Sequence, residues 1–235
     1  LLRKFKFQEA SFGPAAYSYD PRYVYMRGQA VAADGTVIDD SNTDALWLYD
    51  SYEDKFIEKI YENEKYDVGG IGISTRTEKP TFVSYYGDKP ERVWLDSELE
   101  QIYASIEAAF PNDEVSIYGW TENEDKAIIR TWSDTNPGEM YYYDRNKGNI
   151  AFIAKSRPWI NKDEMSPMLP ISFKARDGLE INGYLTIPKN SNGKNLPLII
   201  NPHGGPASRD VWGYNPEHQF FASRGYAVLS MNFRG

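Results

Sequence analysis

The apolar run Leu196-Pro197-Leu198-Ile199-Ile200-Asn201 is followed directly by the glycine-rich loop Pro202-His203-Gly204-Gly205-Pro206. Further along, the sequence predicts a helix over 216–224, because Asn215 suits an N-cap, Pro216 the first helical position and Gly225 a left-handed C-terminal cap. A second apolar run, 226–233, follows as a strand. Strand, glycine loop, helix and strand form a βαβ unit, so we expect a parallel sheet to begin here.

Composition narrows the class of protein. The 235 residues are 41% hydrophobic and 26% charged, which is typical of a globular chain that can bury a core. A net charge of -8 argues against nucleic acid as a partner, and no apolar run approaches the roughly 20 residues that cross a bilayer. There is no cysteine, so disulfides, thiolate metal sites and cysteine nucleophiles are excluded, and the compartment stays open.

The front of the chain differs from the rest. Its net charge is -11 over residues 1–166 and +3 over 167–235. Short aromatic and β-branched runs punctuated by turn residues fill this front part, and 115–155 is predicted to be a four-stranded meander, the size of one propeller blade. The four strands are expected at 115–120, 127–132, 140–143 and 150–154, with further hairpins at 45–49 with 55–61 and at 81–86 with 92–95.

Three local features of the chain refine this picture. Gly69-Gly70-Ile71-Gly72 lacks the spacing of a phosphate-binding loop and is interpreted as a turn between blades. Residues 97–110 are predicted to be a surface helix between blades, capped by Ser97. Asp177-Gly178 predicts a tight type I′ hairpin turn between strands at 171–176 and 179–187. We therefore expect a mixed fold: a partial β-propeller over 1–158, then the first part of an α/β domain over 159–235.

The glycine loop is where chemistry is expected. It follows the carboxyl end of a strand, the edge of an open α/β sheet at which ligands bind. Glycines there let backbone N–H groups approach an oxyanion, and one such donor is worth about 3 kcal/mol in acyl transfer. In its His-Gly-Gly-Gly form this loop is half of the oxyanion hole of α/β-hydrolases. The alternative is an ordinary strand-to-helix turn whose glycines only permit tight packing.

A resemblance to a known family follows from a series of motifs. The sequence resembles the prolyl oligopeptidase family, most nearly its acylaminoacyl-peptidase and dipeptidyl-aminopeptidase-like branch. That resemblance implies a β-propeller followed by an α/β-hydrolase domain, and a serine peptidase of short peptides without cofactor or metal. The motifs are Asp177-Gly178-Leu179, Gly183-Tyr184-Leu185, Pro188, Leu196-Pro197, His203-Gly204-Gly205-Pro206, Arg209-Asp210, Trp212-Gly213, 223–228 and Asn232-Phe233-Arg234-Gly235.

The resemblance also assigns roles to individual residues. The backbone N–H of Gly205 would donate to the oxyanion, Gly204 and His203 would shape the loop, and His203 would tie it down through a side-chain hydrogen bond. Arg209, Asp210 and Trp212 are candidates for a substrate pocket, the alternative being a local ion pair and a packed indole.

None of the catalytic triad is recognised in the chain. No Gly-x-Ser-x-Gly occurs, and Gly72-Ile73-Ser74 fails at its last position. The two histidines are His203, in the loop, and His218, expected to be a partly exposed helical residue, so neither suits the triad base. We therefore expect a section, shortened at both ends, of a serine peptidase, inactive by itself.

Two other classes of function remain open. An esterase shares the glycine loop but explains the β-rich front less well, and a non-catalytic propeller with a degenerate hydrolase domain is a binding module. If these 235 residues were the whole molecule, the sheet begun by 198–201 and 226–233 would have unpaired edges and exposed apolar faces that favour aggregation or association with a second copy of the chain. A peptide substrate is the expected partner, with neither nucleic acid nor a membrane.

Overall fold

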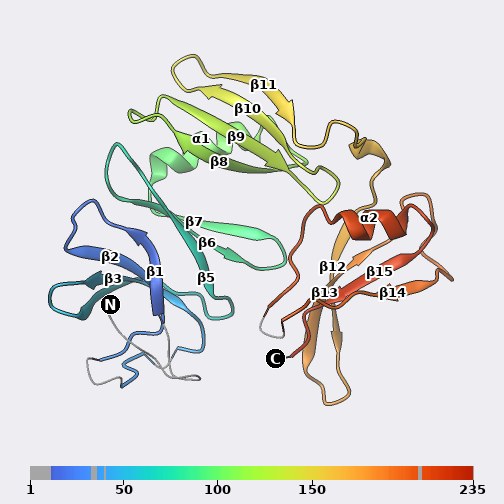
Figure 1. Cartoon of the computed structure of the whole chain (residues 1–235), viewed down its shortest axis with the longest axis horizontal. Coiled ribbons are helices and arrows are strands. Elements are labelled where there is room, and N and C mark those ends of the chain that lie inside the picture. The colour runs from blue at the N-terminus through green and yellow to red at the C-terminus, as the bar shows by residue number, and fades with distance from the viewer. Residues whose placement is uncertain (1–11, 33–35, 40, 206–207, 235) are drawn as a thin grey trace. The chain divides into compact units, whose positions relative to one another are not determined.

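The computed structural model describes residues 12–32, 36–39, 41–205 and 208–234. The chain forms two compact units, Leu1–Gln101 and Ile102–Gly235. The predicted boundary between residues 158 and 159 falls inside the second unit and stays a prediction. In chain order the elements are β1 (Phe12–Tyr17), β2 (Tyr23–Gly28), β3 (Ala45–Asp50), β4 (Lys55–Tyr61), β5 (Val68–Ile73), β6 (Pro80–Tyr86), β7 (Pro90–Trp94), α1 (Ser97–Glu107), β8 (Glu114–Trp120), β9 (Lys126–Trp132), β10 (Glu139–Asp144), β11 (Asn149–Lys155), the 3₁₀ turn η1 (Lys162–Glu164), β12 (Met168–Lys174), β13 (Glu180–Thr186), β14 (Leu198–Ile200), α2 (Pro216–Ala222) and β15 (Ala227–Met231), most of them labelled in Figure 1.

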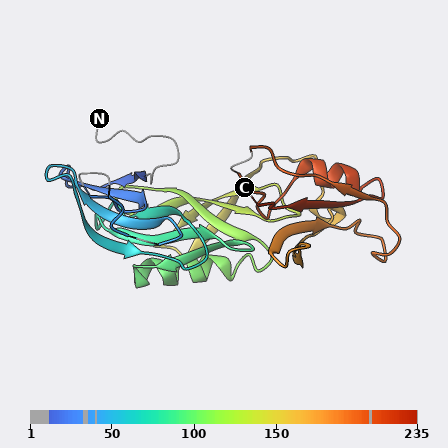
Figure 2. The same cartoon turned by 90° about the horizontal axis from the view of Figure 1, so that it is seen from below.

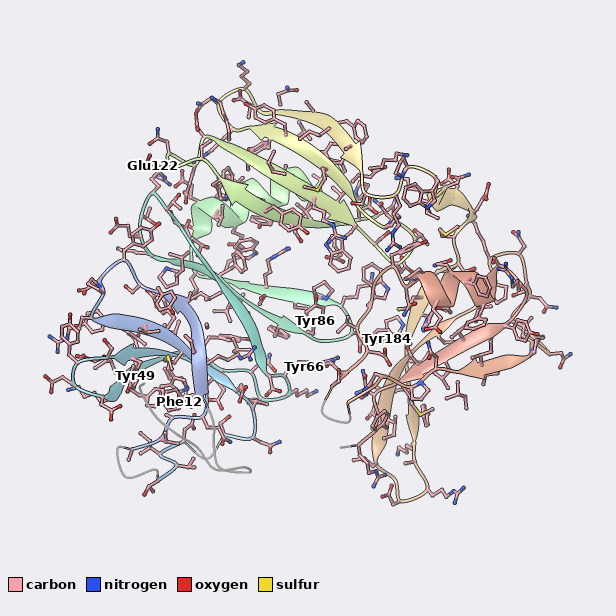
Figure 3. All side chains as sticks on the ribbon, viewed as in Figure 1. Phe12, Tyr49, Tyr66, Tyr86, Glu122 and Tyr184 are labelled. Atoms are coloured by element: carbon pink, nitrogen blue, oxygen red, sulfur yellow. The ribbon has the colours of Figure 1, made fainter. Side chains whose placement is uncertain are left out.

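The first unit contains two antiparallel sheets, β1-β2-β3-β4 and β5-β6-β7. Tyr25 and Leu46 of the first sheet pack against Val68 and Val83 of the second, and all four are buried. A second apolar cluster gathers Phe12 and Tyr49, both labelled in Figure 3, with Phe56. The predicted hairpins β3–β4 and β6–β7 are confirmed, whereas β1, β2 and β5 were not predicted.

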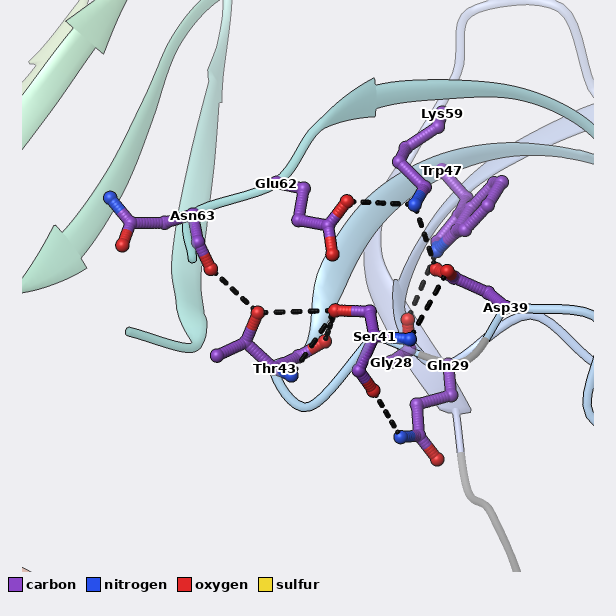
Figure 4. A network of polar contacts seen from close by, with 9 residues as sticks. All are labelled: Gly28, Gln29, Asp39, Ser41, Thr43, Trp47, Lys59, Glu62 and Asn63. Carbon is purple, nitrogen blue, oxygen red and sulfur yellow. Dashed lines mark hydrogen bonds and ion pairs between the residues drawn. The ribbon is translucent and has the colours of Figure 1, made fainter. Parts of the chain in front are cut away.

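A polar network holds the segment before β3 against the end of β4 (Figure 4). Lys59 Nζ lies 2.9 Å from a carboxylate oxygen of Asp39 and 2.7 Å from one of Glu62. The hydroxyl of Thr43 donates to the carbonyl of Asn63 at 2.6 Å. These charge-assisted contacts give the network a structural role in its sheet.

The glycine-rich segment 69–72 is not the predicted turn, because it lies within strand β5. A Cβ atom added to Gly72 would lie 2.3 Å from the ring of Phe82 on the neighbouring strand, and one added to Gly69 would lie 3.2 Å from the carbonyl of Ser84. The glycines therefore allow an aromatic ring and a neighbouring backbone to lie close over the strand. Glycine composition alone could not distinguish this from a turn.

The second unit contains the predicted meander. Strands β8 to β11 pair in sequence as one antiparallel sheet, confirming the four strands expected from the sequence. Helix α1 precedes them, but its cap is Asp96, whose carboxylate accepts from the N–H groups of Glu98 and Leu99 at 2.9 and 3.0 Å. The predicted Ser97 cap is wrong by one residue, because a carboxylate is available immediately before it.

The second sheet of this unit has the order β12-β13-β15-β14. Strands β14 and β15 are parallel, and helix α2 between them lies over one face of the sheet in both views (Figures 1 and 2). The predicted βαβ unit is therefore confirmed. Asn215 caps α2 by accepting from the N–H groups of Glu217 and His218, and Gly225 has a φ of +89°, as expected.

The hairpin β12–β13 is confirmed, but its turn is not type I′. Only Gly178 has a positive φ, +87°, and Asp177 does not. The N–H of Gly178 donates to the carbonyl of Ala175 and the N–H of Ala175 to that of Leu179. This pattern fits a type I turn followed by a left-handed glycine, the three-residue alternative to the predicted two-residue turn.

Candidate active site

The candidate site begins where β14 ends. The N–H of Asn201 donates to the carbonyl of Leu229 at 2.8 Å, which continues the pairing of β14 with β15 by one residue. His203, Gly204 and Gly205 follow directly. The loop therefore leaves the sheet at the carboxyl end of a parallel strand, where sequence analysis placed it. Pro206 lies outside the described residues.

Gly205 has a backbone that favours glycine. Its φ is +143°, a region that side chains rarely adopt, and it is exposed. Gly204 is exposed too, and a Cβ atom built on it would meet none of the described atoms within 4 Å. Packing therefore does not require glycine at position 204. The open space beside this backbone is compatible with the approach of a ligand.

His203 is fixed at the start of the loop. Its Nδ1 lies 3.0 Å from the carbonyl oxygen of Gly204, a contact in which the ring N–H donates. Its ring stacks on Phe233, just after β15, with ring centroids 4.2 Å apart and an angle of 12°. Nε2 is buried and has no hydrogen-bond partner among the described residues. The side chain thus supports the loop from the inside.

The far end of the loop is held by Asn232. Its side-chain oxygen accepts from the N–H of Asp210 at 2.7 Å, and its side-chain nitrogen donates to the Asp210 carbonyl at 3.2 Å. In the sequence, Asn232 is only one residue of the motif 232–235 and has no predicted role. The signal that could have identified it is a polar side chain immediately after a buried strand, at the same sheet edge as the glycine loop.

The three candidate pocket residues lie in different environments. Arg209 is exposed and Asp210 half-buried, while Trp212 is only 4% exposed. The indole N–H of Trp212 donates to the carbonyl of Met168 at 2.9 Å, and its ring lies 5.9 Å from that of Trp132. This is the packed indole that the sequence left open as an alternative. A substrate pocket at these residues stays a prediction.

His218 is not the partly exposed residue that the sequence predicted. It is 1% exposed, because it lies on the face of α2 that packs on the sheet, and its Nδ1 lies 3.1 Å from the hydroxyl of Thr186 on β13. Burial lowers the pKa of His218. Burial raises the pKa of Asp210, and the charges of His203 and His218 oppose that rise.

Other candidate features have structural explanations. Ser74, in the incomplete Gly72-Ile73-Ser74 motif, is buried, and its Oγ accepts from the N–H groups of Arg76 and Thr77 in a turn. The described residues contain no cluster of three or more His, Asp or Glu side chains that could hold a metal ion. Within the same residues, no helix is long and apolar enough to cross a membrane.

Known proteins resemble this chain both in sequence and in fold. No family model matches the chain. Dipeptidyl aminopeptidase BIII of Pseudoxanthomonas mexicana is 34% identical over 202 residues, which are 83% of this chain and 29% of that enzyme. The chain therefore spans less than a third of this relative.

Solved structures show the fold. The acylaminoacyl peptidase of Pyrococcus horikoshii matches 97% of this chain and 33% of its own with a TM-score of 0.57 and 20% identity. A puromycin-hydrolyzing peptidase of Mycobacterium tuberculosis matches 95% of this chain and 33% of its own with a TM-score of 0.61 and 15% identity. The fold is that of enzymes with a propeller and a hydrolase domain.

These matches show that the chain is mostly antiparallel β structure and has the fold of proteins that combine a propeller with a hydrolase domain. Its homologues and structural neighbours, which cover most of the chain, are members of the prolyl oligopeptidase family. The resemblance that was named from the sequence motifs is thereby confirmed.

Proposed function

We propose that this chain is part of a serine peptidase that hydrolyses short peptides through an acyl-enzyme, and that it supplies the oxyanion loop of that enzyme. The observation that carries the proposal is the loop at the end of β14, where Gly205 is exposed with a φ of +143° and none of the described atoms lies within 4 Å of a Cβ built on Gly204. Relatives whose names state aminopeptidase or acylaminoacyl peptidase activity support a peptide substrate.

In the proposed mechanism, a serine oxygen attacks the carbonyl carbon of the scissile bond while a histidine base takes the hydroxyl proton. The carbonyl oxygen becomes an oxyanion and accepts a hydrogen bond from the N–H of Gly205. Collapse of this intermediate breaks the C–N bond, and the base returns the proton to the leaving amine. Water then hydrolyses the acyl-enzyme by the same steps in reverse order.

The nucleophile and the base are proposed to lie outside residues 1–235. No Gly-x-Ser-x-Gly occurs here, and in α/β-hydrolases the triad follows the oxyanion loop along the chain. The loop and its supports would then come from the part of the hydrolase domain within 159–235, after a propeller part over 1–158. By itself this chain is expected to be inactive.

Labelling with a serine-reactive fluorophosphonate tests the proposal. The full-length protein and the 235-residue chain are treated in parallel, and the modified residue is located by mass spectrometry. Labelling of the full-length protein alone, together with cleavage of dipeptidyl amides, supports the proposal. Labelling of neither favours a binding module, and labelling of the short chain means that the active site is misplaced. Cleavage of esters without amides indicates an esterase.

A pair of glycine substitutions in the full-length protein tests the role of Gly205. Gly205→Ala keeps the backbone N–H but strains the backbone and displaces this donor, so kcat should fall about tenfold or more; complete loss of one oxyanion donor costs roughly 10²–10³ in kcat. Gly193→Ala is the matched control, since Gly193 is also exposed with a positive φ, +71°, in another loop of the same domain. Equal kcat values for the two variants would remove Gly205 from the mechanism.

A further inference from the structure

The segment that follows β15 contacts both ends of the described part of the glycine loop. Phe233 stacks on His203, where the loop begins, and the Asn232 side chain pairs with the backbone of Asp210, beyond it. The side-chain amide of Asn232 pairs with both the N–H and the carbonyl of Asp210, as a backbone amide of a neighbouring strand would. Two consecutive residues therefore hold both flanks of Gly204 and Gly205.

The segment is itself held on the sheet. The N–H of Asn232 donates to the carbonyl of Asn182 on β13 at 2.8 Å. One residue past Phe233, the guanidinium of Arg234 contacts both carboxylate oxygens of Asp177 at 2.6 and 2.9 Å. These contacts connect the segment to the β12–β13 hairpin. Asn232 and Phe233 therefore belong to a segment that is bound to β13 and the β12–β13 turn, and their side chains contact the loop.

Within the loop itself, the ring N–H of His203 donates to the carbonyl of Gly204. The carboxylate oxygen Oδ2 of Asp210 and the Nε2 of His203 are buried and have no hydrogen-bond partner among the described residues. The hydrogen bonds from Asn232 act on the Asp210 backbone instead, and the stacking with Phe233 acts on the His203 ring. The segment after β15 therefore helps to position the loop backbone, together with the His203–Gly204 hydrogen bond.

We propose that Asn232 and Phe233 are positioning residues for the oxyanion donor, holding the N–H of Gly205 where the oxyanion forms. This inference rests on the proposed peptidase function. An oxyanion donor lowers the barrier only if it is in place before the reaction, and a misplacement of about 1 Å is able to cost roughly 10² in rate. Neither side chain needs to touch the substrate.

The test uses four variants of the full-length protein. Asn232→Ala removes the pairing with Asp210, and Phe233→Leu removes the ring stack. Phe233→Tyr keeps the ring and is the conservative rescue. Asn192→Ala is the matched control, because Asn192 is exposed and its side chain accepts from one backbone N–H, that of Lys194, in a distant loop.

We expect Asn232→Ala and Phe233→Leu to lower kcat about tenfold or more with KM within about twofold of wild type. Phe233→Tyr and Asn192→Ala should keep the wild-type kcat. The rate ratio between an ester and its thionoester should also fall in the first two variants, because sulfur accepts hydrogen bonds poorly and the ratio reports the oxyanion donor. A purely structural role would lower the unfolding temperature and leave this ratio unchanged.

The possible outcomes separate this inference from the proposed function. A wild-type protein that is neither labelled by fluorophosphonate nor active on amides overturns both. An active wild type whose Asn232→Ala and Phe233→Leu variants keep kcat and the ester-to-thionoester ratio within twofold overturns the positioning role alone. The same holds if Phe233→Tyr loses as much activity as Phe233→Leu.

Discussion

Replacing Trp212 with phenylalanine distinguishes a packed indole from a pocket wall. The side chain is 4% exposed, its N–H donates to the carbonyl of Met168, and its ring packs with Trp132 and Tyr184. Phenylalanine keeps a ring but buries roughly 50 Å² less, which is worth about 1 kcal/mol. Loss of the hydrogen bond adds about 1 kcal/mol, so the free energy of unfolding should fall by about 2 kcal/mol.

Calorimetry of the full-length protein measures this effect. A loss of about 2 kcal/mol corresponds to a fall of roughly 4–8 °C in the unfolding temperature of the transition that contains the second unit. Trp159→Phe is the matched control, because Trp159 is 76% exposed and its substitution should stay within about 0.5 kcal/mol. The KM for peptide substrates should not change in Trp212→Phe. An unchanged unfolding temperature with a raised KM would mean that Trp212 is a wall of a substrate pocket and not a packed indole.

Three further predictions concern the sheet and helix beside the loop. Gly183→Ala should lower the free energy of unfolding by about 2 kcal/mol or more, because its Cβ would lie 2.4 Å from the carbonyl oxygen of Ser230. Gly119→Ala is the control for this thermal unfolding measurement and should be neutral, since none of the described atoms lies within 4 Å of its Cβ. Asn215→Ala removes the cap of α2 and should cost about 1 kcal/mol in urea unfolding; no change would mean that the cap is dispensable. Burial lowers the pKa of His218 in the folded state below 6.5, so the unfolded state binds more protons and stability should fall as pH decreases through 6.5. Unfolding temperatures measured over a pH series test this, and His218→Gln should reduce their dependence on pH in that range.

The sequence predicted the elements that have local signals. Asn215, Pro216 and Gly225 mark the two ends of α2, and turn residues separate the strands of the β8–β11 meander. Both predictions hold because a cap or a turn depends on a few neighbouring residues. The glycine loop was placed correctly at the end of β14 for the same reason.

Three other missed features depend on partners elsewhere in the chain. The ring of Phe82 lies over Gly72 in strand β5, and His218 is buried because α2 turns that face toward Thr186. Asn232 and Asp210 are 22 residues apart, so their pairing exists only in the folded sheet. None of these contacts leaves a periodic pattern in the sequence.

In the proposed mechanism, Gly205 donates a hydrogen bond to the oxyanion of an acyl-transfer reaction. The most direct measurement is a crystal structure of the full-length protein with a phosphonate bonded to its nucleophile, because the phosphonyl oxygen occupies the position of the oxyanion. We expect this oxygen to lie about 2.7–3.1 Å from the backbone nitrogen of Gly205. A phosphonyl oxygen directed away from the His203–Gly205 loop and bound by other donors would remove Gly205 from the mechanism.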